Sequence, residues 1–350
     1  MAQQIWKITS RPPHDFYLCL DVASYFDHEH QPEEIFELGF TRPVPLSDRD
    51  VLVTILFNGN VDSPEFTIST HDSLSNLEQL EADKILRRIL GADLDLGPLY
   101  EQAEYDPVLC GPLRELYGLK RISRANFFED AINRIIRTQI KHKPTARKMV
   151  YKVRNAYGTR LESGDKIIPA WPRPQSIISA DPRSMKQYGL SLRKGEYLTE
   201  LAHELLHGRL AANVCPDSIA DTADAKTASQ KPRTDTSLQD TYKKLESMPP
   251  QELYENLIAI RGIGPTTAQD LILFRNRTDG WFASNKERGR EKAVRRWIIL
   301  AYGGDPDHCS EPEFRQKTQL WQGHEAAALE FLYVNWVLSE KNRNKTPEGI

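Results

Sequence analysis

Two patterns of hydrophobic residues divide the chain. In the first hundred residues, apolar side chains gather in short runs rich in β-branched and aromatic residues and bounded by Pro, Gly, Asn or Asp, a pattern typical of strands. The runs are FYLCLDV, FELGFTRPV, VLVTILFNG and EFTIST. Over residues 75–90, Leu and Ile recur at helical spacing instead. We therefore expect residues 1–112 to form a strand-rich accessory domain that contains one helix.

From about residue 113 onward the apolar spacing becomes helical. The apolar residues of NFFEDAINRIIRTQI fall on one helix face, and the spacing recurs in LRKGEYLTELAHELLHG, LYENLIAI, TTAQDLILF and AALEFLYVNWVL. The polar stretch 213–237 lacks this periodicity, which predicts a flexible insertion. We expect a helical core over residues 113–340, with a hairpin at 257–274, and a polar tail at 341–350. The fold class predicted is α+β: an N-terminal antiparallel β-domain packed on an all-helical core.

Composition narrows the class of protein. The chain has 350 residues, of which 39% are hydrophobic and 27% charged, and we find no apolar run long enough to span a bilayer. The first residues, MAQQIWKITSRPPHDF, lack the pattern of a signal peptide. The four cysteines are scattered without metal-ligand spacing, so neither a zinc site nor an iron–sulfur cluster is expected. An intracellular protein with reduced thiols and no membrane partner is the simplest interpretation.

Positive charge is concentrated in two places, although the net charge is −3. The first cluster contains Arg134, Arg137, Lys141, Lys143, Arg147 and Lys148, and the second contains Lys286, Arg288, Arg290, Lys292, Arg295 and Arg296. A basic face on a near-neutral protein can still bind phosphates, because the contact is local. Charge alone favours the simpler interpretation of solvated helix surfaces.

The segment IRGIGPTTAQDL, residues 260–271, joins two of the predicted helices. Gly262 can end the first helix with a positive φ, and Gly264 leaves the backbone of the turn bare. Pro265 suits the first turn of the second helix, where its missing N–H is not needed. The free amides at that helix start would form an anion site. An ordinary helical hairpin with a glycine cap is an equally good interpretation of the turn alone.

The surroundings favour nucleic acid. The segment resembles the helix-hairpin-helix motif of the DNA glycosylase superfamily, through Leu257, Ile260, Gly262, Ile263, Gly264, Thr267 and Ala268. Three upstream blocks, ILGADLDLGPLYEQAEYDPVL, YGLKRISRANFFEDAINRIIRTQIKHKPTARKMVYKVRNAYG and SADPRSMKQYGLSLRKGEYLTELAHELLHGRL, are similar in the same order to the 3-methyladenine glycosylase type II branch, as is the closing WQGHEAAALEFLYVNW. The resemblance covers about residues 89–336, apart from the polar insertion.

The resemblance implies a monofunctional DNA N-glycosylase of base excision repair. Such an enzyme flips a damaged base, here expected to be alkylated, out of double-stranded DNA and hydrolyses its base–sugar bond. We expect a monomer without a cofactor, apart from a monovalent cation on the hairpin backbone at Ile260 and Ile263. It would act in the nucleoid of a prokaryote or the nucleus of a eukaryote. The alternatives are a catalytically inactive damage-binding protein on the same fold and, less favoured, a hairpin that binds another protein.

The DNA contacts implied by the resemblance come from the hairpin and from the segment TQIKHK. Backbone amides near Gly262, Ile263, Gly264 and Thr266 would hold a phosphate, and Thr267 would either donate to it or cap its helix. Gln139 and Ile140 would form the wedge that fills the gap left by the flipped base; alternatively, Ile140 is core and Gln139 surface. The cations expected on flanking phosphates are Lys141, Lys143 and Arg147.

The base pocket departs from the family pattern. The 3-methyladenine branch often carries Trp and Tyr on the second hairpin helix, and Thr266 and Asp270 stand at those positions here. An aromatic platform for a cationic base would have to come from elsewhere. The candidates are Phe16, Tyr17, Trp281 and Trp321. Each of them is equally well explained as a residue of the hydrophobic core. Thr266 also stands near the place of the lysine of bifunctional relatives, so Schiff-base lyase chemistry is not expected.

The catalytic carboxylate of the family has no direct counterpart. Counting from the hairpin puts its position at Asn285 or Lys286, just after Phe282, and neither is a carboxylate. Asn is nearly isosteric with Asp but carries no charge to oppose a developing sugar cation. Glu287 and Glu291 are the alternatives, although both are well explained as acids at a helix start. We predict that Asn285 occupies the catalytic position and that this chain excises slowly or not at all.

Overall fold

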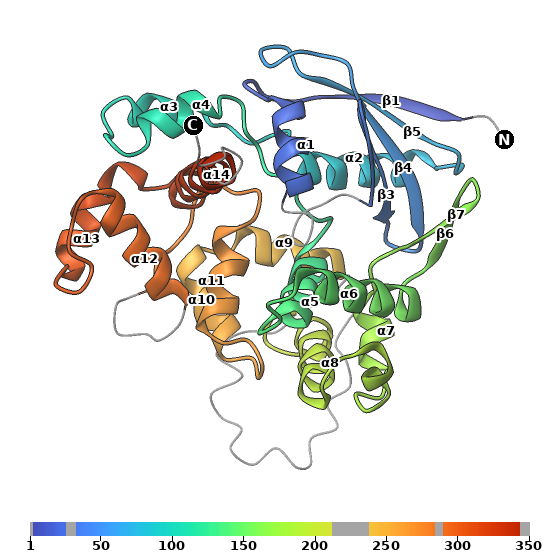
Figure 1. Ribbon diagram of the computed structural model, residues 1–350. Helices are drawn as coiled ribbons and strands as arrows, with labels where there is room; N and C mark the ends of the chain where they lie inside the picture. Colours follow the sequence, from blue (N-terminus) through green and yellow to red (C-terminus); the bar gives the residue numbers. More distant parts are fainter. Residues whose placement is uncertain (1–2, 26–32, 212–237, 284–289, 344–350) are drawn as a thin grey trace, which may run out of the picture.

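The computed structural model describes residues 3–25, 33–211, 238–283 and 290–343. Five strands form one antiparallel sheet in the order β1-β5-β4-β3-β2. Its strands are β1 (Gln4–Thr9), β2 (Glu34–Phe36), β3 (Gly39–Pro45), β4 (Asp50–Phe57) and β5 (Glu65–Thr70). A small hairpin, β6 (Arg160–Ser163) and β7 (Lys166–Pro169), contacts β4 and β3 and interrupts the region that was expected to be all-helical. The sheet and the many helices confirm the α+β class (Figure 1).

The run FYLCLDV, predicted as a strand, is helical. It opens α1 (Phe16–Tyr25), and Asp15 begins this helix by accepting a hydrogen bond from the Leu18 amide through its carboxylate, at 3.0 Å. Phe16, Cys19 and Leu20 are buried while Tyr17 is half exposed. The run is apolar on nearly every position, so its spacing did not separate a strand from a helix, and helical packing against the sheet decided the outcome.

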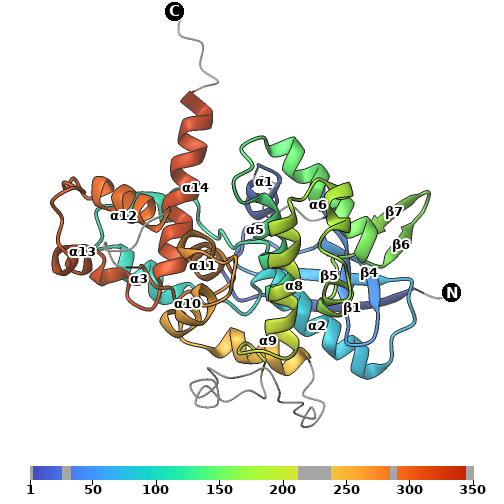
Figure 2. The same ribbon diagram turned by 90° about the horizontal axis from the view of Figure 1, so that it is seen from below.

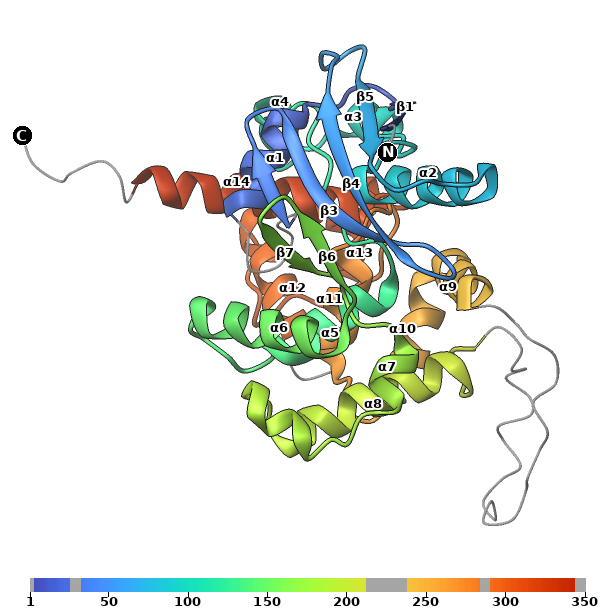
Figure 3. The same cartoon turned by 90° about the vertical axis from the view of Figure 1, so that its right-hand side faces the viewer.

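The helix predicted at residues 75–90 is confirmed as α2 (Asn76–Leu90). Ser75 accepts from the Glu78 amide while the Glu78 carboxylate accepts from the Ser75 amide, so two unpaired donors are satisfied at its start. Gly91 ends the helix with a φ of 62°. Figure 3 shows α2 beside the sheet, where it contacts β3.

Residues 1–112 were expected to contain one helix, but α1 and a further helix at Gly97–Ala103 lie there as well, so that expectation was wrong. From about residue 113 onward the chain is largely helical, as predicted. The remaining helices complete the fold. They are α3 (Gly97–Ala103), α4 (Cys110–Glu115), α5 (Phe127–Arg137), α6 (Lys143–Tyr157), α7 (Pro174–Ile178), η1 (Ser184–Tyr188), α8 (Leu192–Leu206), α9 (Leu238–Ser247), α10 (Pro250–Ile258), α11 (Pro265–Leu273), α12 (Arg290–Ala301), α13 (Glu311–Lys317), η3 (Gln319–Trp321) and α14 (Glu325–Arg343). Among the described helices, none combines the length and the apolar character needed to cross a membrane.

Two buried clusters organise the packing. The first combines the sheet, α1 and α2 with α12, α13 and α14, and the second combines α5 through α11. Helix α11 lies where the two clusters meet, and it contacts α5, α12 and α14 (Figures 1 and 2). A buried ion pair, Arg42 on β3 with Glu129 on α5 at 3.0 Å, joins the sheet to the second cluster. The division at residue 112 stays a prediction, and the C-terminal helices share their core with the sheet.

Candidate nucleic-acid interface

The hairpin between α10 and α11 has the geometry that its glycines predict. Gly262 has a φ of 94°, in the left-handed region that favours glycine. A Cβ atom placed there would lie 2.1 Å from Cγ of Tyr197 on α8, so no other residue fits without rearrangement. Ile260 and Ile263 on either side are buried. The turn is therefore fixed both by backbone conformation and by packing.

Gly264 begins α11 and is exposed. Its φ and ψ are −84° and 172°, a Cβ atom there would meet nothing within 4 Å, and Pro265 follows as the first helical residue. No side chain at the N-cap position of this described helix accepts a hydrogen bond from its first turn. Thr267 is buried in that turn and Thr266 is half-buried. The start of α11 thus offers backbone amides and the positive end of a helix dipole at the surface.

The segment after α5 forms a sharp turn. Gln139 is exposed at its tip with a φ of 66°, the one positive φ at a non-glycine position among the described residues. Ile140 is half-buried and packs against the second cluster. Strained backbone at an exposed turn is typical of a functional position.

Helix α8 holds both turns. Nζ of Lys194 donates to the carbonyls of Ile136 and Thr138, at 2.7 and 2.8 Å, and partial burial lowers the pKa of this ammonium group. Three residues later Tyr197 packs against Gly262, and Glu196 forms an ion pair with Arg261 of the hairpin at 2.7 Å. Residues three apart lie on one helix face about 4.5 Å along the axis. The Gln139 turn and the glycine hairpin are therefore anchored side by side.

The basic clusters contain both exposed and buried cations, and of the second cluster only the side chains of Arg295 and Arg296 are among the described residues. Lys141, Lys143 and Arg147 are exposed at and beyond the Gln139 turn. In the second cluster, Arg295 is only 1% exposed, and its guanidinium donates to the Ala283 carbonyl at 2.9 Å and contacts the Glu311 carboxylate at 2.5 Å. The guanidinium also lies 3.7 Å from the centre of the Phe314 ring. Arg295 is thus a core anchor rather than a surface cation.

The aromatic candidates for a base platform are mostly core residues. Phe16 and Trp321 are fully buried, and the Trp321 indole donates to Asp106 at 3.1 Å. Trp281 is half-buried and its ring lies 4.7 Å from that of Tyr254. Tyr17 is half exposed but packs edge-on against a ring of the sheet. Burial removes Phe16 and Trp321 as surfaces on which a base could stack in this structure.

Asp270 belongs to a polar cluster that sequence reasoning did not assemble. Its carboxylate is 4% exposed and forms an ion pair with Arg134 of α5 at 3.1 Å. Arg124 and Asp130 form a second pair at 3.1 Å beside them, and these four residues line a small cavity with Asn133, Leu271 and Phe274. The signal in the sequence was one acidic residue, Asp270, on a helix with no other charged residue. We call these five polar residues the α5–α11 polar cluster.

The expected catalytic position lies at the edge of the described structure. Asn285, Lys286 and Glu287 lie outside the described residues, and Glu291 falls in the first turn of α12, where its side chain is outside them too. Ala283, just before this segment, is held by a hydrogen bond, because its amide donates to Oε1 of Gln269 on α11 at 2.9 Å. Ala283, the last described residue before Asn285, therefore lies beside α11.

No protein-family model matches the chain, but individual proteins do. It is 26% identical over 200 residues to a DNA-3-methyladenine glycosylase of Bacillus subtilis, covering 56% of each chain. It is 32% identical over 100 residues to DNA-3-methyladenine glycosylase 2 of Escherichia coli, covering 29% of this chain and 35% of that protein. The chain thus matches about half or less of the length of these curated relatives.

Solved structures share the fold along nearly the whole chain. A 3-methyladenine DNA-glycosylase from Archaeoglobus fulgidus aligns with a TM-score of 0.65 and 19% identity, covering 94% of this chain and 97% of that one. An 8-oxoguanine glycosylase/lyase from Clostridium acetobutylicum aligns with a TM-score of 0.62 and 14% identity, covering 95% and 97%. These findings confirm the resemblance to the helix-hairpin-helix DNA glycosylase superfamily.

Proposed function

We propose that this chain, which has the fold of the helix-hairpin-helix DNA glycosylases and sequence similarity to their 3-methyladenine branch, is a DNA N-glycosylase of base excision repair. The observation that carries the proposal is the pairing of the two turns on α8: an exposed helix start at Gly264 and an exposed, strained Gln139, held by Tyr197 and Lys194. Binding a distorted duplex needs a phosphate site and a wedge next to each other.

The backbone of the hairpin is proposed to make the phosphate contact. Amides at the start of α11 would donate to a phosphate beside the lesion, and the absence of a side chain on Gly264 lets the backbone approach it. Lys141, Lys143 and Arg147, exposed next to the Gln139 turn, would neutralise neighbouring phosphates. A monovalent cation on the carbonyls of Ile260 and Ile263 is compatible with this turn, because the Ile260 carbonyl accepts one hydrogen bond, from the Ile263 amide at 3.1 Å, and keeps a second lone pair.

Gln139 is proposed to be the wedge, and Ile140 is proposed to support it. A left-handed conformation at a non-glycine residue costs about 1–3 kcal/mol, and it keeps the Gln139 side chain exposed at the tip of the turn. Inserted into a duplex, Gln139 would occupy the gap left by the flipped nucleotide, while the half-buried Ile140 fixes the base of the turn to the second cluster. The flipped base would enter between α5 and α11.

The reaction is proposed as hydrolysis without a covalent enzyme intermediate. Thr266 has no amine with which to form a Schiff base, and the substrate is proposed to be an alkylated base in double-stranded DNA, as the names of the B. subtilis and E. coli relatives suggest. Asn285 is proposed at the catalytic position, with Glu291 and Glu287 as alternatives. Thr266 and Asp270 would face the base, and the chain is proposed to act as a monomer.

The second candidate function is a damage-binding protein without catalysis, and the residue that favours it is Asn285, where a carboxylate would be expected. An incision assay separates the candidates. Duplexes carrying alkylated bases are incubated with the protein and analysed with and without alkali: a monofunctional glycosylase leaves strands that break only after alkali treatment. Tight binding to an abasic-site duplex without any alkali-labile product would support the damage-binding protein, and strand breakage without alkali would contradict the monofunctional assignment.

A further inference from the structure

A second charged pocket lies at the far end of α11 from the hairpin. It has a volume of about 450 Å³, within the range of small-molecule sites of roughly 300–1,000 Å³. The end of α2, the end of α9 and the segment after α11 surround it, and about 14 Å of helix separates it from Gly264. The cationic residues on its wall are Lys84, Arg87, Arg88, Arg275 and Arg277.

Three of these arginines have carboxylate partners. Arg87 pairs with Asp83 at 2.8 Å, Arg88 with Glu246 at 2.8 Å, and Arg277 donates to Asp279 through Nε at 2.6 Å. These pairs shape the wall of the pocket and hold the elements together. They leave little positive charge unbalanced at those positions.

Arg275 differs from them. It is 8% exposed, and its Nε and Nη2 atoms have no hydrogen-bond partner among the described residues. Its position is fixed, because the neighbouring Asn276 donates to the Arg88 and Ile89 carbonyls at 2.7 and 3.2 Å. Burial, and then the charges of Arg277 and Arg88, lower the pKa of Arg275 to about 9. A buried guanidinium with unpartnered donors is costly unless an anion pairs with it.

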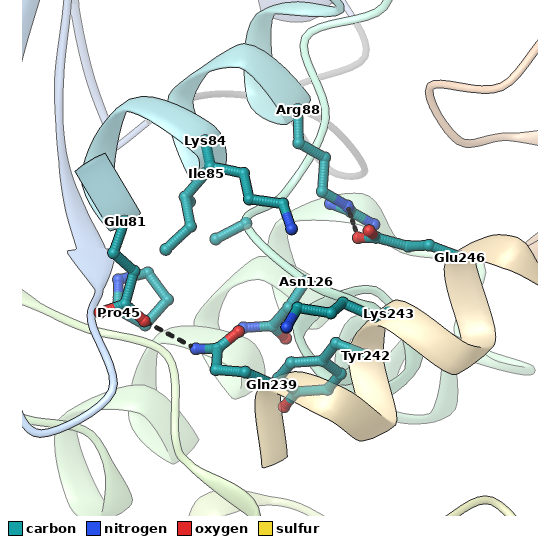
Figure 4. A pocket seen from close by; sticks show the side chains of 11 residues that line it. Pro45, Glu81, Lys84, Ile85, Arg88, Asn126, Gln239, Tyr242, Lys243 and Glu246 are labelled. Carbon is teal, nitrogen blue, oxygen red and sulfur yellow. Dashed lines mark hydrogen bonds and ion pairs between the residues drawn. The ribbon is translucent and has the colours of Figure 1, made fainter. Parts of the chain in front are cut away.

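Lys84 supplies a second cation. It is exposed on α2 and makes no ion pair within the described part of the chain. Figure 4 shows Lys84 reaching from α2 into the adjoining pocket toward α9, while Arg88 beside it is engaged with Glu246. A planar guanidinium fork and a flexible ammonium group together suit an anion with several oxygens and more than one negative charge.

We propose that this pocket, called here the α2–α11 pocket, binds a phosphate group, with Arg275 as the buried anchor and Lys84 as the second cation. The group belongs either to a small phosphorylated molecule or to a DNA backbone. The site is independent of the proposed excision chemistry, since the hairpin is at the opposite end of α11. Because the ligand would bridge α2 with α9 and the end of α11, binding would stabilise the folded chain.

Thermal unfolding of the full chain tests the proposal. In phosphate or pyrophosphate at ten times the dissociation constant, the midpoint should rise by about 2 °C over chloride of equal ionic strength. Arg275→Met and Lys84→Gln should each lose this rise, while Lys186→Gln, an exposed lysine outside the pocket, should keep it. In chloride, Arg275→Met should be at least as stable as the unsubstituted chain, because it removes an uncompensated buried charge.

The affinity of Lys84→Gln for duplex DNA distinguishes the two sources of the phosphate group. Lys84→Gln with unchanged affinity for undamaged duplex indicates a small phosphorylated ligand, and a loss of affinity indicates a DNA phosphate. The proposal is overturned if phosphate gives the unsubstituted chain no more stability than chloride, or if Lys84→Gln retains the full rise. The result for Lys84→Gln tests the proposal even if Arg275→Met fails to fold.

Discussion

Replacing Gly264 with Asp tests the phosphate contact at the start of α11 without disturbing the fold. The backbone there is extended, with a φ of −84°, and an added Cβ meets open space. Asp is a preferred N-cap residue, and the change from Gly is worth only a few tenths of a kcal/mol in stability. The variant should therefore fold as well as the unsubstituted chain.

The expected cost to DNA binding follows from the added charge. A carboxylate at the N-cap would lie next to a phosphate held on the same amides, and would compete for them. Two like charges at about 4 Å repel by roughly 1 kcal/mol in bulk water and about 4 kcal/mol at the effective dielectric constant of a protein surface. These bounds correspond to binding weaker by about 5-fold to roughly 1,000-fold.

The assay is fluorescence anisotropy with an undamaged duplex and with an abasic-site duplex at one salt concentration. Both affinities should fall by a similar factor, because a phosphate contact positions the duplex without reading the lesion. Gly264→Asn is the matched control: it has nearly the same shape and also caps the helix, but carries no charge, and should bind far better than the Asp variant. Normal binding by Gly264→Asp would refute the phosphate role, and equal losses in both variants would indicate steric exclusion instead.

Three further predictions follow from individual contacts. Gly262→Ala should lower the free energy of unfolding by about 2–4 kcal/mol in urea titrations, since the new Cβ meets Tyr197 at a positive φ; a loss below about 1 kcal/mol would contradict this. Gln139→Gly should relieve backbone strain yet bind an abasic-site duplex about tenfold more weakly, with little change for undamaged duplex in anisotropy; an equal loss for both would count against the wedge. Burial lowers the pKa of His14 to about 3, so the unfolded chain takes up this proton below about pH 6.5 and the folded chain only near pH 3, and stability is lost as the pH falls through that window. His14→Gln should flatten this decline in urea titrations between pH 7 and pH 4, and an unchanged slope would contradict it.

The hairpin was predictable because its chemistry is local. Positive φ at Gly262 and a bare helix start at Gly264 depend on residues adjacent in sequence, and the structure has both features. The helix at 75–90 was predictable from the local spacing of its Leu and Ile residues. The structure adds the cap at its start, in which Ser75 and Glu78 satisfy each other's amides.

The rest depended on contacts between residues that are distant in sequence. In the sequence, Arg295 belongs to a basic cluster that predicts a charged surface. In the structure its guanidinium is buried and bonded to Glu311 and to the Ala283 carbonyl. The pairing of Asp270 with Arg134 joins residues 136 positions apart, so neither residue alone predicts the α5–α11 polar cluster. The hydrogen bonds that Lys194 donates to the carbonyls before Gln139 could not be predicted without the fold either.

Release of free base from DNA is the most direct test of the proposal that this chain is a glycosylase. The unsubstituted chain and Asn285→Asp are incubated side by side with duplexes treated with alkylating, deaminating or oxidising agents, and the released bases are identified by mass spectrometry. Asn285→Asp should release alkylated bases about 100-fold faster, since roughly 3 kcal/mol of transition-state stabilisation corresponds to that factor. Efficient release by the unsubstituted chain that Glu291→Gln abolishes would move the catalytic role to Glu291. Release of no base by either protein would contradict the glycosylase itself.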